Sequence, residues 1–158
     1  AGERTVQELL ERFFIVRTSW LFGRQGNNFV KTMLRLSQTK TEVNVVCDQI
    51  GSPTYSEDLA LLLCSMIGTE QYGIYHASNE GICSWADFAE EIFRIAGKKV
   101  KVNPIPASRF PSKATRPANS RMSKDKLEKM GFSRLPSWQD ALKKYLASVQ
   151  VTGEEETP

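Results

Sequence analysis

Short apolar runs alternate along this chain with longer segments whose apolar residues recur every three or four positions. The runs predict strands, and the longer segments predict amphipathic helices. Strands are expected at residues 14–16, 43–47 and 73–77. Alternation of this kind is typical of an α/β fold, in which helices cover the faces of a mostly parallel sheet. With 158 residues, the chain has the length of one domain or of one lobe of a larger one.

The predicted helices carry recognisable start and stop signals. Ser84-Trp85-Ala86-Asp87 is a variant capping box with Asp in the Glu/Gln position, and Ser137-Trp138-Gln139-Asp140 repeats it. Ser56 is predicted to cap a helix whose buried stripe is Leu59, Leu62, Leu63, Met66 and Ile67. Further helices are expected at residues 6–13, 29–34 and 123–130. Residues 102–119 are predicted to be mostly loop. We expect one ordered domain over residues 1–150 and a disordered acidic tail over 151–158.

Composition excludes several classes of protein. A net charge of +3 with 41% hydrophobic residues is globular, and no apolar run approaches the roughly 18 residues of a membrane span. The start, Ala1-Gly2-Glu3-Arg4, lacks the apolar core of a secretion signal. Cys47, Cys64 and Cys83 are widely spaced, so reduced thiols in a cytoplasmic protein and no metal site are expected. His76, the single histidine, is interpreted as a hydrogen-bonded structural residue.

No complete catalytic motif is present, but two stretches are unusual. The first is Arg17-Thr18-Ser19-Trp20-Leu21-Phe22-Gly23, which follows a predicted buried strand and begins with polar residues that lead into aromatic ones. Residues at the carboxyl end of such a strand face the crevice where α/β proteins bind ligands. Trp20 could there form a flat wall for a sugar or base, or belong simply to the core.

The second stretch is basic. Residues 108–131 hold seven basic and two acidic residues, a local excess larger than the net charge of the chain. Such an excess suits a phosphorylated small molecule, because a guanidinium can bind phosphate oxygens with two hydrogen bonds. A solvated basic face is the alternative. Nucleic acid is not expected as a partner, because the overall charge is low and the stretch has few aromatic residues. The basic residues are Arg109, Lys113, Arg116, Arg121, Lys124, Lys126 and Lys129.

Four ordered motifs resemble those of the dTDP-4-dehydrorhamnose reductase family, within the extended short-chain dehydrogenase/reductases. They are Arg17-Thr18-Ser19-Trp20, Gly26-Asn27-Asn28-Phe29-Val30-Lys31-Thr32-Met33, Asp48-Gln49-Ile50-Gly51-Ser52-Pro53-Thr54 and Arg116-Pro117-Ala118-Asn119-Ser120. The resemblance extends over residues 1–147. It implies the C-terminal portion of a Rossmann-like fold with a small, mainly helical substrate-binding lobe.

The resemblance also implies a reaction and a set of site residues. Family members use NADPH or NADH to reduce the 4-keto group of a dTDP-linked deoxysugar to give dTDP-L-rhamnose. By position, the residues implied at the substrate are Trp20, Asn28, Gln49, Thr54, Arg116 and Asn119, with Arg121 as a weaker candidate. Arg17, Thr18 and Ser19 match the strand end near the nicotinamide. Family members can be homodimers, some with magnesium at the interface.

The same resemblance predicts a deficit. The family's catalytic Tyr-x-x-x-Lys motif and Gly-rich dinucleotide loop have no counterpart in this sequence. We therefore expect no catalytic residue in this chain and no activity from it alone. Two alternatives stay open at this point. One is a non-catalytic regulatory module, as in the regulatory β subunit of methionine adenosyltransferase, and the other is a related nucleotide-sugar reductase or epimerase.

Overall fold

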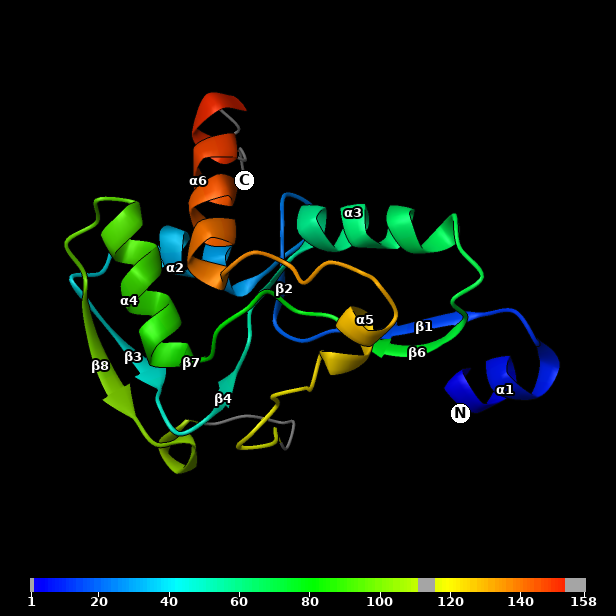
Figure 1. Cartoon of the computed structure of the whole chain (residues 1–158). Helices are drawn as coiled ribbons and strands as arrows, with labels where there is room; N and C mark the ends of the chain where they lie inside the picture. Colours follow the sequence, from blue (N-terminus) through cyan, green and yellow to red (C-terminus); the bar gives the residue numbers. More distant parts are fainter. Residues whose placement is uncertain (1, 111–115, 153–158) are drawn as a thin grey trace.

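The computed structural model describes residues 2–110 and 116–152. Two groups of elements lie side by side, and β2 runs between them (Figure 1). In the described residues, the strands form four two-stranded sheets: β1–β6, β2–β5, β3–β8 and β4–β7. The elements are α1 (Gly2–Leu9), β1 (Phe14–Arg17), β2 (Leu21–Phe22), α2 (Phe29–Leu36), β3 (Glu42–Val46), β4 (Ile50–Gly51), β5 (Thr54–Tyr55), α3 (Ser56–Ile67), β6 (Gly73–His76), β7 (Cys83–Ser84), α4 (Trp85–Ile95), β8 (Lys101–Ile105), a 3₁₀ turn (Ala107–Arg109), α5 (Asp125–Lys129) and α6 (Trp138–Thr152).

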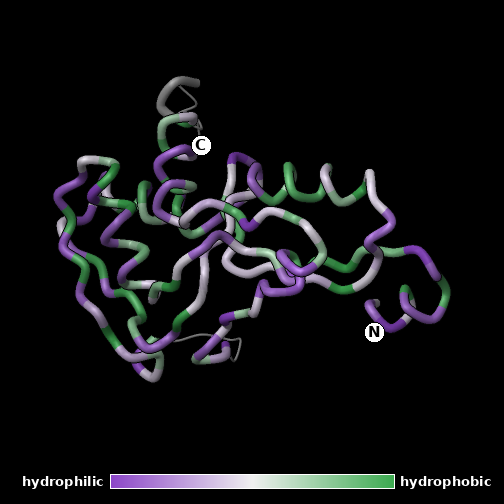
Figure 2. Tube along the Cα trace, viewed as in Figure 1, coloured by the Kyte–Doolittle hydropathy of each residue, from purple (hydrophilic) through white to green (hydrophobic). Residues whose placement is uncertain are grey.

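The first group is built on the parallel pair β1–β6. Phe14 pairs with Gly73 and Arg17 with His76, so both strands end at the same edge. Helices α3 and α5 flank this pair in Figure 1, and Figure 2 shows a hydrophobic run along β1. A separate apolar core forms here because side chains from α3, β6 and α5 meet. Its buried members include Leu62, Met66, Tyr75 and Leu127.

The second group packs α2, α4 and α6 with the parallel pair β3–β8. Glu42 and Asn44 of β3 are exposed while Val43 and Val45 are buried, which is the alternation of a half-covered strand. The larger core lies among these elements. It is rich in aromatic contacts: the Phe22 ring lies 5.5 Å from the Tyr55 ring and 5.7 Å from the Phe88 ring.

A buried polar cluster connects the two groups. Asn79, which is fully buried, accepts a hydrogen bond from the Tyr55 backbone N–H at 2.8 Å. Its amide nitrogen donates to Asp58 at 2.9 Å and to the Pro136 carbonyl at 3.1 Å. The Lys124 ammonium donates to the Asn79 carbonyl at 3.2 Å. One side chain therefore joins α3, the segment after β6 and the approach to α6.

Most predicted elements are confirmed, and with them the α/β class. The capping box at Ser84 is complete, with the Asp87 carboxylate accepting from the Ser84 N–H at 2.8 Å. The Ser137 hydroxyl accepts from the Asp140 N–H at 3.1 Å at the start of α6 and donates to the Asp140 carboxylate at 2.7 Å. His76 is hydrogen-bonded as expected, with Nδ1 lying 3.2 Å from the Ser123 carbonyl oxygen.

Four expectations about the elements differ from the structure. The helix predicted at residues 6–13 spans Gly2–Leu9, and none of its residues is buried. Ser56 is the first residue of α3 and not its cap; Tyr55 takes the cap position without a side-chain hydrogen bond. Ile67 is 75% exposed, because the apolar stripe of α3 turns away from the core at its last residue. The predicted loop at 102–119 was wrong at its start, where β8 pairs with β3 through Pro104. Pro104 concealed this strand, since proline is rare inside sheets and is tolerated on edge strands.

At the C-terminus, α6 extends through Thr152, two residues past the predicted end of the ordered domain. Residues 153–158 of the predicted tail lie outside the described part of the chain.

Candidate functional site

Trp20 has an unusual backbone and an unusual neighbour. Its φ is +48°, the only positive φ at a non-glycine residue in the described part of the chain. Such a conformation is rare for a bulky residue. The Trp20 indole stacks on the Trp85 indole with ring centroids 3.6 Å apart and planes inclined by 11°. Both indoles are half-buried, at the margin of the larger core. The stack therefore lies where a flat aromatic surface can meet a ligand.

The third and fourth motifs meet beside this stack. β4 pairs on one side with β7, whose last residue Ser84 precedes Trp85. On its other side, Ile50 donates to the Ala118 carbonyl and accepts from the Ser120 N–H, both at 2.9 Å. A Cβ atom on Gly51 would overlap Ser120 Oγ and lie 2.8 Å from Trp20 Cε2. The backbone of β4 can thus approach Trp20 only because residue 51 is a glycine.

The second motif reaches the stack through Phe29. The Phe29 ring lies 4.7 Å from the Trp85 ring and 5.6 Å from the Phe88 ring. All four motifs, far apart in sequence, therefore converge on the Trp20–Trp85 pair. This convergence could not be read from spacing alone, because it depends on how β4, α2 and α4 pack.

Asn28 is the N-cap of α2 and directly precedes Phe29, which contacts the stack. Its Oδ1 accepts from the Lys31 N–H at 3.0 Å, and its Nδ2 donates to the Gly23 carbonyl at 2.8 Å. Both ends of the amide are therefore engaged within the protein. Asn28 is therefore placed to fix the start of α2, and hence Phe29.

We expect Asn28→Ala to lower the free energy of unfolding by about 1–2 kcal/mol, as loss of an N-cap does elsewhere. Asn28→Asp should lose much less, because the carboxylate can still accept from the Lys31 N–H. Chemical denaturation of both variants measures the difference. Equal losses would contradict the capping role.

The hydroxyls of Ser19 and Thr54 also have internal partners. Ser19 Oγ donates to the Ser52 carbonyl at 2.8 Å, and Thr54 Oγ1 donates to the Ser19 carbonyl at 2.7 Å. Thr54 is completely buried, and its N–H donates to the Trp20 carbonyl at 3.1 Å. These contacts hold the backbone of residues 19 and 20. Gln49 is half-buried directly before β4.

Arg17 is the last residue of β1, and Thr18 follows it. The Arg17 guanidinium forms a two-pronged ion pair with Glu3, with Nε to Oε1 at 2.9 Å. That hydrogen bond holds the pKa of the Glu3 carboxyl below its usual value. Arg17 Nη1 also lies 3.4 Å from His76 Nε2. Thr18 is exposed at this edge of the β1–β6 pair.

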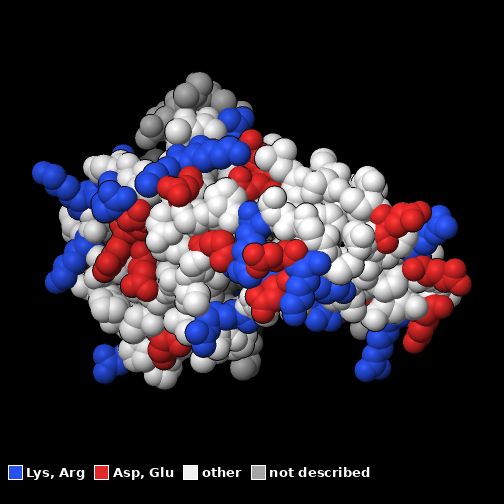
Figure 3. Space-filling view, viewed as in Figure 1, with Lys and Arg blue, Asp and Glu red and all other residues white. Residues whose placement is uncertain are grey.

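The basic stretch does not form a single cationic surface. The Lys124 ammonium is buried against Glu80 at 2.9 Å, and the Lys126 ammonium lies 4.6 Å from the centre of the Tyr75 ring. Arg134 forms ion pairs with Asp125 and Glu128, the two acidic residues of the stretch, both at 3.0 Å. Figure 3 shows the result as interspersed positive and negative side chains over the centre of the molecule. The local charge excess is therefore dispersed, with two of its cations engaged internally.

The remaining predicted residues of this stretch lie near β4. Asn119 forms a parallel bridge with Ile50 and accepts from Arg121 through both its N–H and its Nε at 3.0 Å. Arg116 is exposed, two residues before Ala118 bonds to Ile50. Lys113 lies outside the described residues. Arg116 is thus attached by a short connection to the strand that flanks Trp20.

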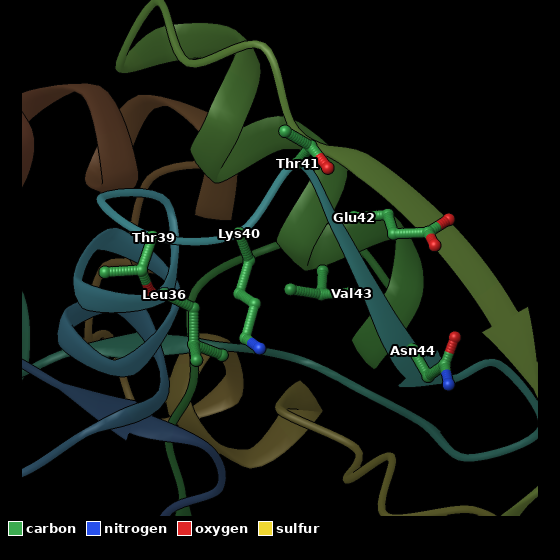
Figure 4. Close-up of a pocket in the computed structure, with 7 residues that line it drawn as sticks. All are labelled: Leu36, Thr39, Lys40, Thr41, Glu42, Val43 and Asn44. Atoms are coloured by element: carbon green, nitrogen blue, oxygen red, sulfur yellow. The ribbon is translucent and has the colours of Figure 1, made fainter.

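Two pockets lie elsewhere on the described surface. One follows the turn from α2 into β3, where Lys40 lies between Leu36 and Asn44 (Figure 4). The other, of about 720 Å³, lies between residues 21–28 and the start of α3, and Asn28 is the one predicted residue that lines it. In that pocket, burial raises the pKa of Tyr55 to about 12, and its hydroxyl donates to Glu57 at 2.6 Å. Tyr55 thus lacks the lowered pKa of a catalytic tyrosine.

Three further observations bear on chemistry. The described residues contain no group of three or more metal-ligating side chains of His, Cys, Asp or Glu. All three cysteines are free, and burial raises the pKa of Cys83 to about 12. Within the described ranges, no helix has both the length and the apolar character needed to cross a membrane.

Sequence reasoning missed two residues of this site. The sequence pattern marks Trp85 only as part of a predicted capping box, and Gly51 only as part of a motif. A glycine within a short strand often marks close backbone approach, and that signal could have identified Gly51. No signal in the sequence pairs Trp85 with Trp20, because their contact crosses 65 positions of the chain.

The arrangement was then compared with known proteins. The model of the RmlD substrate-binding domain matches residues 1–151. A dTDP-4-dehydrorhamnose reductase of Sinorhizobium fredii is 39% identical over 165 residues, covering 98% of this chain and 56% of that protein. One of Aggregatibacter actinomycetemcomitans is 46% identical, covering 90% and 52%. The crystal structure of the Bacillus anthracis enzyme in complex with NADP has a TM-score of 0.90 and 48% identity, covering 94% and 52%. This chain spans about half the length of these relatives.

Proposed function

The chain belongs to the RmlD substrate-binding domain family, and from this premise we propose that it is the sugar-nucleotide-binding portion of a dTDP-4-dehydrorhamnose reductase. The reaction is the NADPH- or NADH-dependent conversion of dTDP-4-dehydro-L-rhamnose to dTDP-L-rhamnose. The relatives carry that enzyme's name, and the fold is Rossmann-like. The observation that carries the proposal is the convergence of four separate motifs on the Trp20–Trp85 stack.

The half-buried Trp20 indole and the exposed Arg116 guanidinium suit a dTDP-linked deoxysugar. Pockets for small molecules combine an apolar wall with a few polar groups that fix orientation. The Trp20 indole supplies the wall for the sugar ring. Arg116 supplies a guanidinium for the diphosphate, which it can bind through two parallel hydrogen bonds. Gln49 directly precedes β4, and Asn119 bridges to Ile50 of that strand. Asn28 and Thr54 support the site indirectly, because Asn28 fixes the position of Phe29 and Thr54 fixes the Trp20 backbone.

The cofactor belongs at the end of the β1–β6 pair, where open parallel sheets bind ligands. Thr18 is exposed there and is the residue of this chain that would contact the nicotinamide. Arg17 and Ser19 help to position the end of β1, because their side chains are already bonded to Glu3 and Ser52. The cofactor supplies the hydride. The proton donor is not expected here, because the sequence holds no Tyr-x-x-x-Lys motif. The 158-residue chain alone should therefore show no NADPH-dependent turnover.

Titration calorimetry of the chain with dTDP-L-rhamnose tests the binding role. Trp20→Ala and Arg116→Ala should each weaken binding by at least about tenfold, which is the loss of one aromatic contact or one charge-assisted hydrogen bond. Arg35→Ala is the matched control: Arg35 is exposed on α2, away from the stack, and should leave affinity unchanged. Equal affinity in all four proteins would refute the site assignment.

Other outcomes would point to other functions. Stronger binding of a different nucleotide sugar in a panel would indicate a related reductase or epimerase. Capture of a partner enzyme, with no sugar-nucleotide binding, would indicate a regulatory module. Assembly as a homodimer is part of the proposal. Magnesium at its interface would need ligands from both protomers, because the described residues of one chain hold no cluster of three. The exposed free thiols of Cys47 and Cys64 favour the reducing cytoplasm.

A further inference from the structure

We propose that Trp85 is a positioning residue: by stacking on Trp20, it holds the indole in the orientation that contacts the sugar nucleotide. This inference rests on the proposed function. It adds a residue from outside all four motifs, placed by geometry alone. The contact that carries it is the parallel stack of two indoles, 3.6 Å apart and both half-buried.

Trp20 needs such support because its backbone conformation is unfavourable. A residue with φ of +48° persists only when its surroundings fix it, and such residues cluster at binding and active sites. Thr54 fixes the backbone through its N–H to the Trp20 carbonyl and its hydroxyl to the Ser19 carbonyl. Those two bonds leave the indole free to rotate about its own side-chain bonds. The stack on Trp85, together with the close approach of the Gly51 backbone, limits this rotation.

Trp85 is itself firmly held. It is the first residue of α4, and the reciprocal capping box of Ser84 and Asp87 defines the backbone there. Its ring also contacts Phe29, 4.7 Å away, which the Asn28 cap places at the start of α2. Two helix starts therefore position one ring, and that ring positions Trp20. A rigid aromatic surface lowers the entropy lost when a ligand binds.

The stack has a spectroscopic signature. Substitution of a tryptophan outside the stack should leave that signature unchanged. Two closely stacked indoles couple excitonically and give a paired positive and negative band in the far-ultraviolet circular dichroism spectrum. The chain has three tryptophans, so Trp138→Phe is a matched control. Trp138 is buried against Phe88 and takes no part in the stack. The Trp138→Phe variant should therefore keep the paired band although it has one tryptophan fewer.

The experiment measures that band and dTDP-L-rhamnose affinity in wild type, Trp85→Ala, Trp85→Phe and Trp138→Phe. Trp85→Ala should lose the band and bind about tenfold more weakly, as expected for loss of one aromatic pair. Trp85→Phe should lose the band and keep affinity within about threefold, because a phenyl ring can still stack. Thermal unfolding verifies that each variant is folded.

The outcomes separate this inference from the proposed function. A wild-type protein that binds no dTDP-sugar refutes the proposed function and the inference with it. Wild-type binding with an unchanged affinity in folded Trp85→Ala refutes the inference alone.

Discussion

Gly51→Ala is expected to abolish measurable dTDP-sugar binding and to lower the melting temperature by about 3–10 °C. The added methyl group would overlap Ser120 Oγ and lie 2.8 Å from Trp20 Cε2. Ser120 can rotate, but Trp20 cannot yield without separating from Trp85, against which it is stacked. Forcing an extra carbon into a packed site costs about 1–3 kcal/mol, which corresponds to that shift for a chain of this size. Binding suffers more, because the displaced indole is the proposed sugar contact.

Gly68→Ala is the matched control. Gly68 ends α3 with φ of −75°, and a Cβ atom there meets nothing within 4 Å. Its substitution should leave binding unchanged and stability equal or slightly raised, because alanine loses less backbone entropy on folding. Calorimetric titration and a thermal scan of both variants decide the matter. Wild-type affinity in Gly51→Ala would mean that the close approach of β4 to Trp20 has no role in binding.

Asn79→Ala should cause the largest loss of stability, about 3 kcal/mol or more. The substitution leaves the Tyr55 N–H without its acceptor, and Asp58 and the Pro136 carbonyl each lose a donor. Each buried polar group that loses its partner costs about 1–3 kcal/mol. The two cores should separate more easily, because this amide joins the segments between them. Urea denaturation gives the change in the free energy of unfolding.

Two comparisons sharpen this test. Asn44→Ala, at an exposed position of β3, should change the free energy of unfolding by no more than about 0.5 kcal/mol. Asn79→Asp places a second carboxylate beside Asp58, and repulsion raises the pKa of the pair. That variant should be destabilised at pH 7 and recover as the pH falls, because the folded state then binds more protons than the unfolded state. A loss for Asn79→Ala as small as for Asn44→Ala would show that the cluster is not a structural connection.

Local signals account for most of the elements. The capping boxes at Ser84 and Ser137 were predictable because a cap is satisfied by residues within one helical turn. Strand β8 was not, because its sequence contains Pro104 and its evidence is a partner strand about 60 residues away. The exposed Ile67 has a similar cause. An apolar stripe specifies a face of α3, whereas the length of the core decides how much of that face is covered.

The site, too, depends partly on local sequence signals and partly on contacts between distant residues. The residue order alone established an α/β chain, the helix caps at Ser84 and Ser137 and the four motifs that identify its family. Packing alone established that the side chains of Asn28, Ser19 and Thr54 have hydrogen-bond partners within the protein, that Lys124 and Lys126 contact Glu80 and Tyr75, and that Trp85 stacks on Trp20. The physical reason is range: caps and periodicity act over a few residues, while stacking, burial and charge pairing join side chains that only the folded backbone brings together.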